Sequence, residues 1–163
     1  MNNNKYILSG RFILHMMVLL LLGYSLSAQS SPVNKPFVIP ELKEWTAGNG
    51  YFIPKNSTRI VCNFKDPELL RIAQLFSDEY FQMFHIRLAV ADGKARKGDI
   101  EFIIKPDGEL GKEGYSIKIA NRITVSSPTA IGSYWGTRTL LQLAEQSEER
   151  KFPQGIIRDY PSS

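Results

Sequence analysis

Two segments carry helix-start signals, and short strand-like segments surround them, which restricts the fold to a mixture of helices and strands. The first signal is Asp66-Pro67-Glu68. Asp66 can cap the first turn, Pro67 fits the first helical position and Glu68 suits the positive end of the helix. Apolar residues then recur at steps of three and four and predict a helix that ends near its last member: Leu69, Ala73, Phe76, Tyr80 and Phe84.

The second helix signal follows the same logic, with Ser127 as the predicted cap and Pro128 in the first turn. Residues at helical spacing continue from there: Ile131, Tyr134, Trp135, Arg138, Leu141 and Gln142. Gly132 and Gly136 are poor helix formers that lie on one face of this helix. Because small residues permit close backbone approach, this face should pack on a strand or on another domain, and we favour the strand.

A hairpin gives the clearest strand prediction. Residues 115–119 alternate between apolar and polar side chains, and Asn121 tolerates the turn that leads into a strand at 123–125. Further strands are predicted at 51–53, 58–62, 86–90 and 100–104. Two helices and about six strands predict an α+β fold of two layers, a mixed sheet with both helices packed on one face. The predicted core includes Phe76, Tyr80, Ile117, Ile119, Ile131 and Trp135.

Residues 1–28 predict a secretory signal peptide. Lys5 and Arg11 provide a basic start, residues 12–22 are mostly apolar, and small residues precede a plausible cleavage site after Ala28. The alternative is an uncleaved membrane anchor, which needs about 20 apolar residues, more than this segment offers. We therefore expect an exported protein, periplasmic or secreted, with no membrane segment after cleavage and with a flexible leader at 29–36.

The charge balance gives no reason to expect nucleic-acid binding. The whole chain has 20 basic and 16 acidic residues, but two of the basic residues belong to the predicted signal peptide, which contains no acidic residue. The mature chain is therefore close to neutral. The small basic loop that contains Lys94, Arg96 and Lys97 is most simply solvated.

The sequence offers only weak candidates for reactive side chains. Cys62 cannot form an intramolecular disulfide, because it is the single cysteine, and its apolar neighbours predict a buried thiol. His85 follows the predicted first helix and is more easily read as part of its C-terminal cap than as a catalyst. Asp78 and Glu79 are the tempting carboxylate pair, but adjacent helical residues diverge, so a solvated helix face is the better interpretation. The sequence predicts no catalytic, metal or cofactor residue.

Several motifs together resemble the N-terminal, non-catalytic domain of family 20 β-N-acetylhexosaminidases. The most specific are the helix Gly132–Leu143, which is similar to a family pattern G..YG..TL.QL, and the exit Ile156–Pro161, which is similar to I.D.P. The strand Gly114–Ile119 matches GY.I.I, and Ile39-Pro40 and Gly50–Ile53 match the family's opening. The resemblance covers residues 37–161.

This resemblance implies a domain at 37–155 and a linker at 156–163 that leads to a catalytic (β/α)8 barrel. In the family, the barrel supplies an Asp-Glu pair and hydrolyses terminal N-acetylhexosamine residues of glycans. No position here matches that pair, so no catalytic residue is transferred, no cofactor is implied, and this chain alone is predicted to be inactive. The barrel would be its partner and would alone contact the glycan. The alternative is a standalone periplasmic carbohydrate-binding or interaction module.

Overall fold

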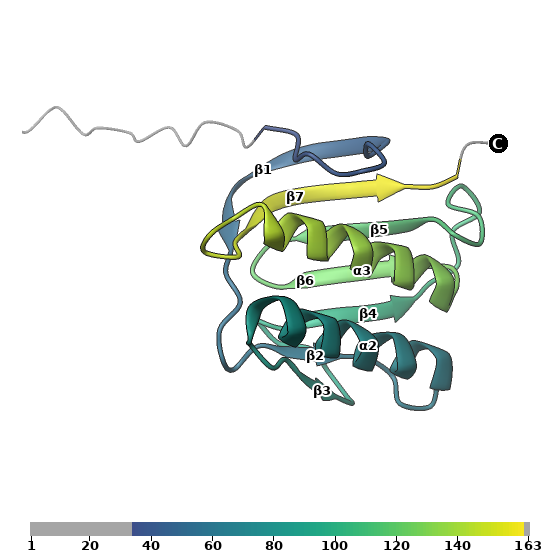
Figure 1. Ribbon diagram of the computed structural model, residues 1–163. Helices are drawn as coiled ribbons and strands as arrows, with labels where there is room; N and C mark the ends of the chain where they lie inside the picture. The colour runs from purple at the N-terminus through teal and green to yellow at the C-terminus, as the bar shows by residue number, and fades with distance from the viewer. Residues whose placement is uncertain (1–33, 162–163) are drawn as a thin grey trace, which may run out of the picture. The chain divides into compact units, whose positions relative to one another are not determined.

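A computed structural model describes residues 34–161, which form two helices and seven strands (Figure 1). The expected signal peptide at 1–28 and most of the leader lie outside the described residues. The helices are α2 (Pro67–Phe84) and α3 (Ala130–Glu145). The strands are β1 (Glu44–Phe52), β2 (Arg59–Val61), β3 (Ala89–Ala91), β4 (Ile100–Ile104), β5 (Tyr115–Ile119), β6 (Ile123–Ser127) and β7 (Phe152–Asp159).

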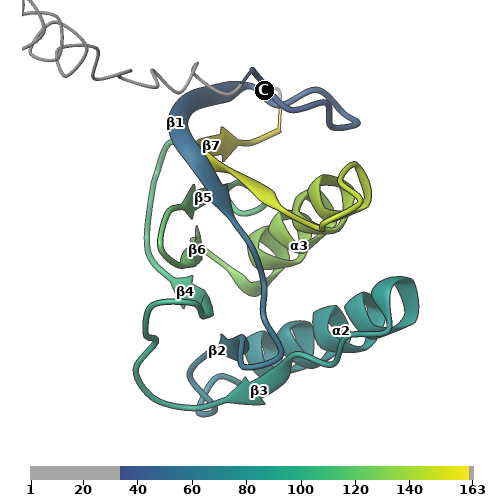
Figure 2. The same ribbon diagram turned by 90° about the vertical axis from the view of Figure 1, so that its left-hand side faces the viewer.

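The strands form one mixed sheet in the order β1-β7-β5-β6-β4-β2-β3. The pairs from β1 to β6 are antiparallel, and the pairs from β6 to β3 are parallel. Figure 2 shows the sheet nearly edge-on, with α2 and α3 both on one side of it. The predicted two-layer α+β fold with both helices on one face is therefore confirmed.

Strand β7 was not among the predicted strands. Residues 156–159, which the sequence analysis placed in a linker, lie inside the sheet, where β7 pairs with both β1 and β5. Ile157 stands between Trp45 and Ile117 in the register and is fully buried. The sequence did not predict this strand because it contains Pro153 and Gly155, and both residue types are unfavourable in strand interiors.

Helix α2 follows its sequence signals closely. The Asp66 side chain accepts a hydrogen bond from the backbone N–H of Leu69 over 3.0 Å, and Pro67 begins the helix. At the other end, His85 adopts a left-handed conformation with φ of 57° and donates its backbone N–H to the carbonyl of Phe81 over 2.8 Å. The interpretation of His85 as a helix cap is confirmed, although its backbone, not its ring, makes the bond.

Helix α3 begins later than predicted. Its N-cap is Thr129, whose hydroxyl accepts the backbone N–H of Gly132 over 3.4 Å, and the prediction of Ser127 as cap was wrong. Ser127 is the last residue of β6, paired opposite Ile104. Its hydroxyl donates to the Thr129 carbonyl over 2.8 Å and therefore supports the turn that carries the chain from the sheet into the helix.

Helix α3 packs on the sheet through its glycines, as expected. A Cβ atom on Gly132 would collide with the carbonyl oxygen of Gly114, and one on Gly136 would lie 2.8 Å from Cγ1 of Val125 on β6. The absence of side chains at these two positions therefore allows the helix backbone to approach the sheet.

The predicted core is right for four residues and wrong for two. Phe76, Tyr80, Ile117 and Ile119 are buried. Ile131 and Trp135, however, are 52% and 44% exposed. The buried face of α3 is formed by its small residues and by leucines further along, namely Gly132, Ser133, Gly136, Leu140 and Leu143. The helix therefore turns Ile131 and Trp135 away from the sheet.

Candidate functional site

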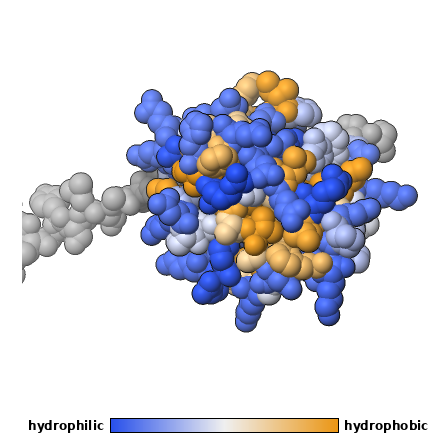
Figure 3. All heavy atoms as spheres, turned by 60° about the horizontal axis from the view of Figure 1, so that its bottom comes forward, coloured by the Kyte–Doolittle hydropathy of each residue, from blue (hydrophilic) through white to orange (hydrophobic). Residues whose placement is uncertain are grey.

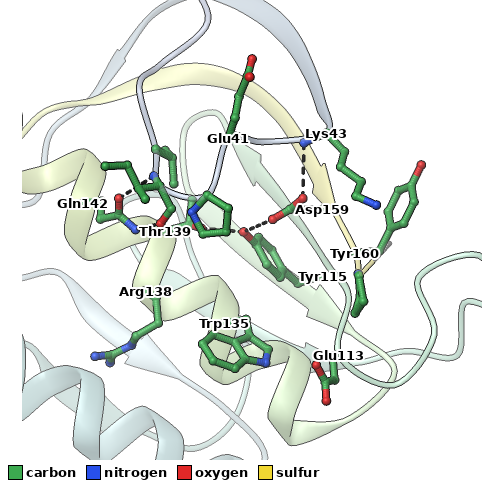
Figure 4. A pocket seen from close by; sticks show the side chains of 14 residues that line it. Glu41, Lys43, Glu113, Tyr115, Trp135, Arg138, Thr139, Gln142, Asp159 and Tyr160 are labelled. Atoms are coloured by element: carbon green, nitrogen blue, oxygen red, sulfur yellow. Dashed lines mark hydrogen bonds between the residues drawn. The ribbon is translucent and has the colours of Figure 1, made fainter. Parts of the chain in front are cut away.

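A groove of about 600 Å³ lies between the segment 38–43, helix α3 and the end of β7 (Figure 4). Residue Tyr115 of β5 contributes to its floor, and Trp135 of α3 contributes an exposed ring to its wall. Tyr160 and Pro161, which follow β7, complete the lining. Segments from both ends of the described chain and from its middle therefore meet at one place.

Asp159 joins three of these segments. Its Oδ2 atom accepts a hydrogen bond from the Tyr115 hydroxyl over 3.1 Å, and its Oδ1 atom accepts the backbone N–H of Lys43 over 3.3 Å. The Tyr115 hydroxyl also shares a hydrogen bond of 2.6 Å with the Thr139 hydroxyl on α3. Burial, with the neighbouring Asp159 carboxylate, raises the pKa of Tyr115 above its ordinary value, so this phenol stays protonated and able to donate.

Gln142 of α3 fixes the segment before β1. Its Oε1 atom accepts the backbone N–H of Ile39 over 2.9 Å, and its Nε2 atom donates to the carbonyl of the same residue over 3.0 Å. One turn later, Gln146 donates to the carbonyl of Phe37. The glutamine side chains of the helix thereby satisfy backbone N–H and C=O groups of the extended segment. In a sheet, the backbone of a neighbouring strand would do this.

Arg138 of α3 forms a two-point ion pair with Glu79 of α2. Its Nη1 atom donates to Glu79 Oε1 over 2.9 Å, Nη2 bonds Oε2, and the guanidinium lies 4.7 Å from the ring centre of Tyr134. Asp78 instead pairs with Arg87 at the surface. The two neighbouring carboxylates therefore diverge, as expected, and each is bound by a different arginine. The prediction that both are solvated is wrong for Glu79, whose side chain is only 27% exposed.

The rim next to the chain's exit is held by aromatic and ionic contacts. The Lys43 ammonium lies 4.5 Å from the centre of the Tyr160 ring, and the Tyr160 hydroxyl donates to Glu44 Oε1 over 3.3 Å. Glu113 projects toward the groove from the loop before β5 (Figure 4). This arrangement fixes the direction in which the chain leaves the sheet.

The remaining sequence candidates offer no reactive group. Cys62 is buried, and burial, together with the nearby Asp92 and Asp66 carboxylates, raises the pKa of its thiol to about 11. A thiol of this kind stays protonated at neutral pH and is a poor nucleophile. The residues of the basic loop, Lys94, Arg96 and Lys97, are exposed as predicted.

Within residues 34–161, no three His, Cys, Asp or Glu side chains are placed to hold a metal ion. Neither helix of this part of the chain is long and apolar enough to cross a membrane.

The sequence carries no local signature of the groove. Its motifs contained Gln142 and Asp159, but the partners of these residues, Ile39 and Lys43, lie 103 and 116 positions away. Only the tertiary fold brings such distant segments together. The polar residues Arg138 and Gln142, which lie at helical spacing in α3 and are half-buried, were the one local signal that this helix faces more than the sheet.

The comparisons with known proteins agree with this architecture. A family model described as glycosyl hydrolase family 20, domain 2, matches residues 35–160. Lacto-N-biosidase of Bifidobacterium bifidum is 30% identical over 144 residues, which are 85% of this chain and 12% of that protein.

Solved structures of similar fold are larger than this chain. The N-acetyl-β-hexosaminidase of Streptomyces plicatus superposes with a TM-score of 0.62 at 22% identity, over 82% of this chain and 28% of its own. The β-N-acetylhexosaminidase of Bacteroides fragilis superposes with a TM-score of 0.57 at 20% identity, over 76% of this chain and 24% of its own. The chain thus spans between about an eighth and just over a quarter of these relatives. Since the family model covers almost all of the described residues, the chain belongs to glycosyl hydrolase family 20, as the domain called domain 2.

Proposed function

We propose that this chain serves as the non-catalytic N-terminal domain of an exported β-N-acetylhexosaminidase and that a catalytic barrel is its partner. The observation that carries the proposal is the family match over residues 35–160, together with the small share of each relative that the chain spans. Hydrolysis of terminal N-acetylhexosamine residues would belong to the whole enzyme. The basic and apolar pattern of residues 1–28 supports export.

Apolar side chains are exposed on both faces of the domain, and on the sheet face away from the helices they are Ile103 of β4 and Ile156 of β7. On the face of the sheet away from the helices, β5 and β6 present polar side chains: Ser116, Lys118, Thr124 and Ser126. On the helix side, Ile131 and Trp135 remain exposed. Figure 3, turned toward the side of α2, shows apolar side chains gathered among charged ones. Exposed apolar groups of this kind are typical of a surface that another domain covers.

The adjacent carboxylates Asp78 and Glu79 are each engaged by another side chain. Glycoside hydrolysis needs an acid near the glycosidic oxygen and a second group that assists at the anomeric carbon. Asp78 and Glu79 are adjacent, but each is bound by a different arginine, Arg87 and Arg138. The domain would therefore contribute stability and placement to the enzyme, and the barrel would contribute the chemistry.

The coding sequence downstream of residue 163 provides the first test. We expect a continuous or frame-shifted reading frame for a family 20 barrel, and the polypeptide that includes it should hydrolyse a chromogenic N-acetyl-β-glucosaminide. The chain of 163 residues should give no turnover in the same assay. An unrelated downstream gene would contradict the proposal and favour the standalone module. Intact-mass analysis of periplasmic protein tests export, and a product that retains Met1 would contradict it.

A further inference from the structure

Cationic side chains gather where the loop between β3 and β4 meets the turn of the β5–β6 hairpin. The backbone N–H of Gly98 in the loop donates to the carbonyl of Asn121 in the turn over 2.8 Å. In the other direction, Arg122 Nη1 donates to the carbonyl of Ala95 over 3.3 Å. The cationic side chains on these two joined segments form what we call the basic patch: Lys94, Arg96, Lys97, Lys118 and Arg122.

Two carboxylates beside the basic patch are largely withdrawn from water. The Asp99 side chain is only 5% exposed and is paired with Arg59 over 2.6 Å. The Glu101 side chain is 19% exposed and lies 3.5 Å from Arg122. Within residues 34–161, the other four side chains of the basic patch have no ion-pair partner. Their positive charges therefore face water without compensation.

The basic patch lies on the face of the sheet away from the helices, and so away from the groove. Tyr115 of β5 reaches α3, where its hydroxyl shares a hydrogen bond with that of Thr139. Because side chains alternate along a strand, Lys118, three positions later, points to the opposite face. Figure 2 shows the loop between β3 and β4 on that same side of the sheet. A ligand therefore reaches the basic patch without displacing either helix.

We propose that the basic patch binds a polysaccharide chain that carries sulfate groups. Sulfates spaced along a chain can pair with several cations at once and release counterions from the partners, which is the source of affinity for a polyanion. The arginines add guanidinium groups, whose parallel N–H donors suit an oxyanion. The inference goes beyond the proposed function, in which only the catalytic domain contacts the glycan, and shares with it only the glycan as the class of ligand.

Nucleic acids and membranes suit this surface less well. Single-stranded nucleic acids bind by stacking their bases on exposed aromatic side chains. Segments that lie on a membrane insert apolar side chains beside their cations. Among residues 94–101 and 118–124, no aromatic or large aliphatic side chain is exposed. A sulfated polysaccharide needs neither kind of side chain, because ionic contacts alone bind it.

The first experiment uses the full chain, with Lys97→Gln/Lys118→Gln as the test variant. Lys65→Gln/Lys112→Gln is the matched control. All four lysines are exposed, and both double variants lose the same charge. Lys65 follows the end of β2 and Lys112 precedes the start of β5, so both lie at the opposite edge of the sheet from the hairpin turn. Circular dichroism confirms that both variants are folded.

The measurement is calorimetric titration with heparin as the sulfated probe. The parent chain should bind heparin, and its affinity should fall about tenfold in the test variant but by less than about twofold in the control. The slope of log affinity against log salt concentration should decrease by between about one and two in the test variant, because two cations are lost. Fully desulfated heparin, which keeps its carboxylates, should not bind.

Several results would overturn the inference. These are no binding of heparin to the parent, equal losses in both variants, which would reflect net charge alone, or desulfated heparin bound as tightly as heparin. Duplex DNA or phosphatidylglycerol vesicles bound more tightly than heparin, with the loss confined to the test variant, would also overturn it and assign the basic patch to that class of partner. The lack of a downstream catalytic domain would overturn the proposed function but leave the heparin result unchanged, so the two failures are distinguishable.

Discussion

Glu79 on α2 and Arg138 on α3 face each other across the two helices, with Arg138 Nη1 2.9 Å from Glu79 Oε1. Both side chains are about a quarter exposed, at 27% and 26%, and the contact has the two parallel bonds that arginine and carboxylate groups form best. It is a polar link between two helices that also pack on each other beside the sheet. It also holds one wall of the groove, because Arg138 lines that groove.

Removing this link should destabilise the domain measurably. Arg138→Ala should lower the free energy of unfolding by about 1 kcal/mol in urea titration, the upper end for ion pairs that are not fully buried. Arg87→Ala is the matched control, because Arg87 also pairs with an α2 carboxylate and stacks on an aromatic ring, but both members of its pair are more than half exposed. Its effect should be near zero, and equal effects of the two variants would show that the interhelical contact adds nothing.

The sequence predicted that two aromatic residues lie in the core, but only one of them is buried. Phe76 is fully buried and Trp135 is 44% exposed. Phe76→Ala should cost about 3–5 kcal/mol of unfolding free energy, because it removes a buried ring and leaves a cavity. Trp135→Ala should cost about 1 kcal/mol or less, as is usual for exposed positions. Denaturant titration of both variants tests this, and a similar loss for Trp135→Ala would place its ring in the core.

The features that could be predicted from the sequence are local ones. The cap at Asp66, the end of α2 at Phe84 and the hairpin at 115–125 depend on residues within a few positions of each other, and all three are confirmed. The inward face of α3 was misjudged because hydrophobicity alone placed Trp135 inside. Steric fit decides which face of α3 is buried, because its glycines lie where the sheet comes closest to the helix backbone. Aromatic residues on the same helix are then left outside.

The features that could not be predicted depend on pairing between distant segments. Strand β7 joins the sheet only because β1 and β5 flank it, and no periodic pattern within 152–159 shows that position. The groove likewise needs segment 38–43 beside the end of β7, and Asp159 is what joins them. Neither Lys43 nor Asp159 has a sequence neighbour that reveals this contact. Long-range pairing, not local propensity, therefore decides where the candidate site lies.

Because α3 lies close to the sheet, replacing one of its glycines by alanine should lower stability, the opposite of the usual effect in a helix. In an open helix, Gly→Ala stabilises by about 1 kcal/mol. At Gly136 the new Cβ would lie 2.8 Å from Val125 Cγ1, so Gly136→Ala should instead destabilise by about 1–3 kcal/mol through overpacking. Gly108→Ala serves as control, because nothing lies within 4 Å of a Cβ there. Thermal melts compare the variants, and a more stable Gly136→Ala protein would contradict the packing of α3 described above.

The ion pair between the buried Asp99 and the half-buried Arg59 predicts how stability depends on pH. Burial by itself raises the pKa of Asp99, but hydrogen bonds from the Arg59 guanidinium, 2.6 Å away, and from the Arg96 backbone outweigh it and hold this pKa below its ordinary value. The folded protein therefore binds this proton less readily than the unfolded chain does. The stability that results is present above the ordinary pKa of an aspartate, about 3.9, and is lost as the pH falls through the lower folded value.

Two substitutions at this pair should change the acid profile in different ways. Asp99→Asn should lower the unfolding free energy at neutral pH and flatten its decline in acid, because the titrating group is gone. Arg59→Gln leaves the buried carboxyl without its main charged partner, so the pKa of Asp99 should rise and the acid loss should begin at higher pH than in the parent. Urea titrations across the acid range measure both effects. An Arg59→Gln protein with the parent's acid profile would show that Arg59 does not hold the Asp99 carboxylate in its charged form.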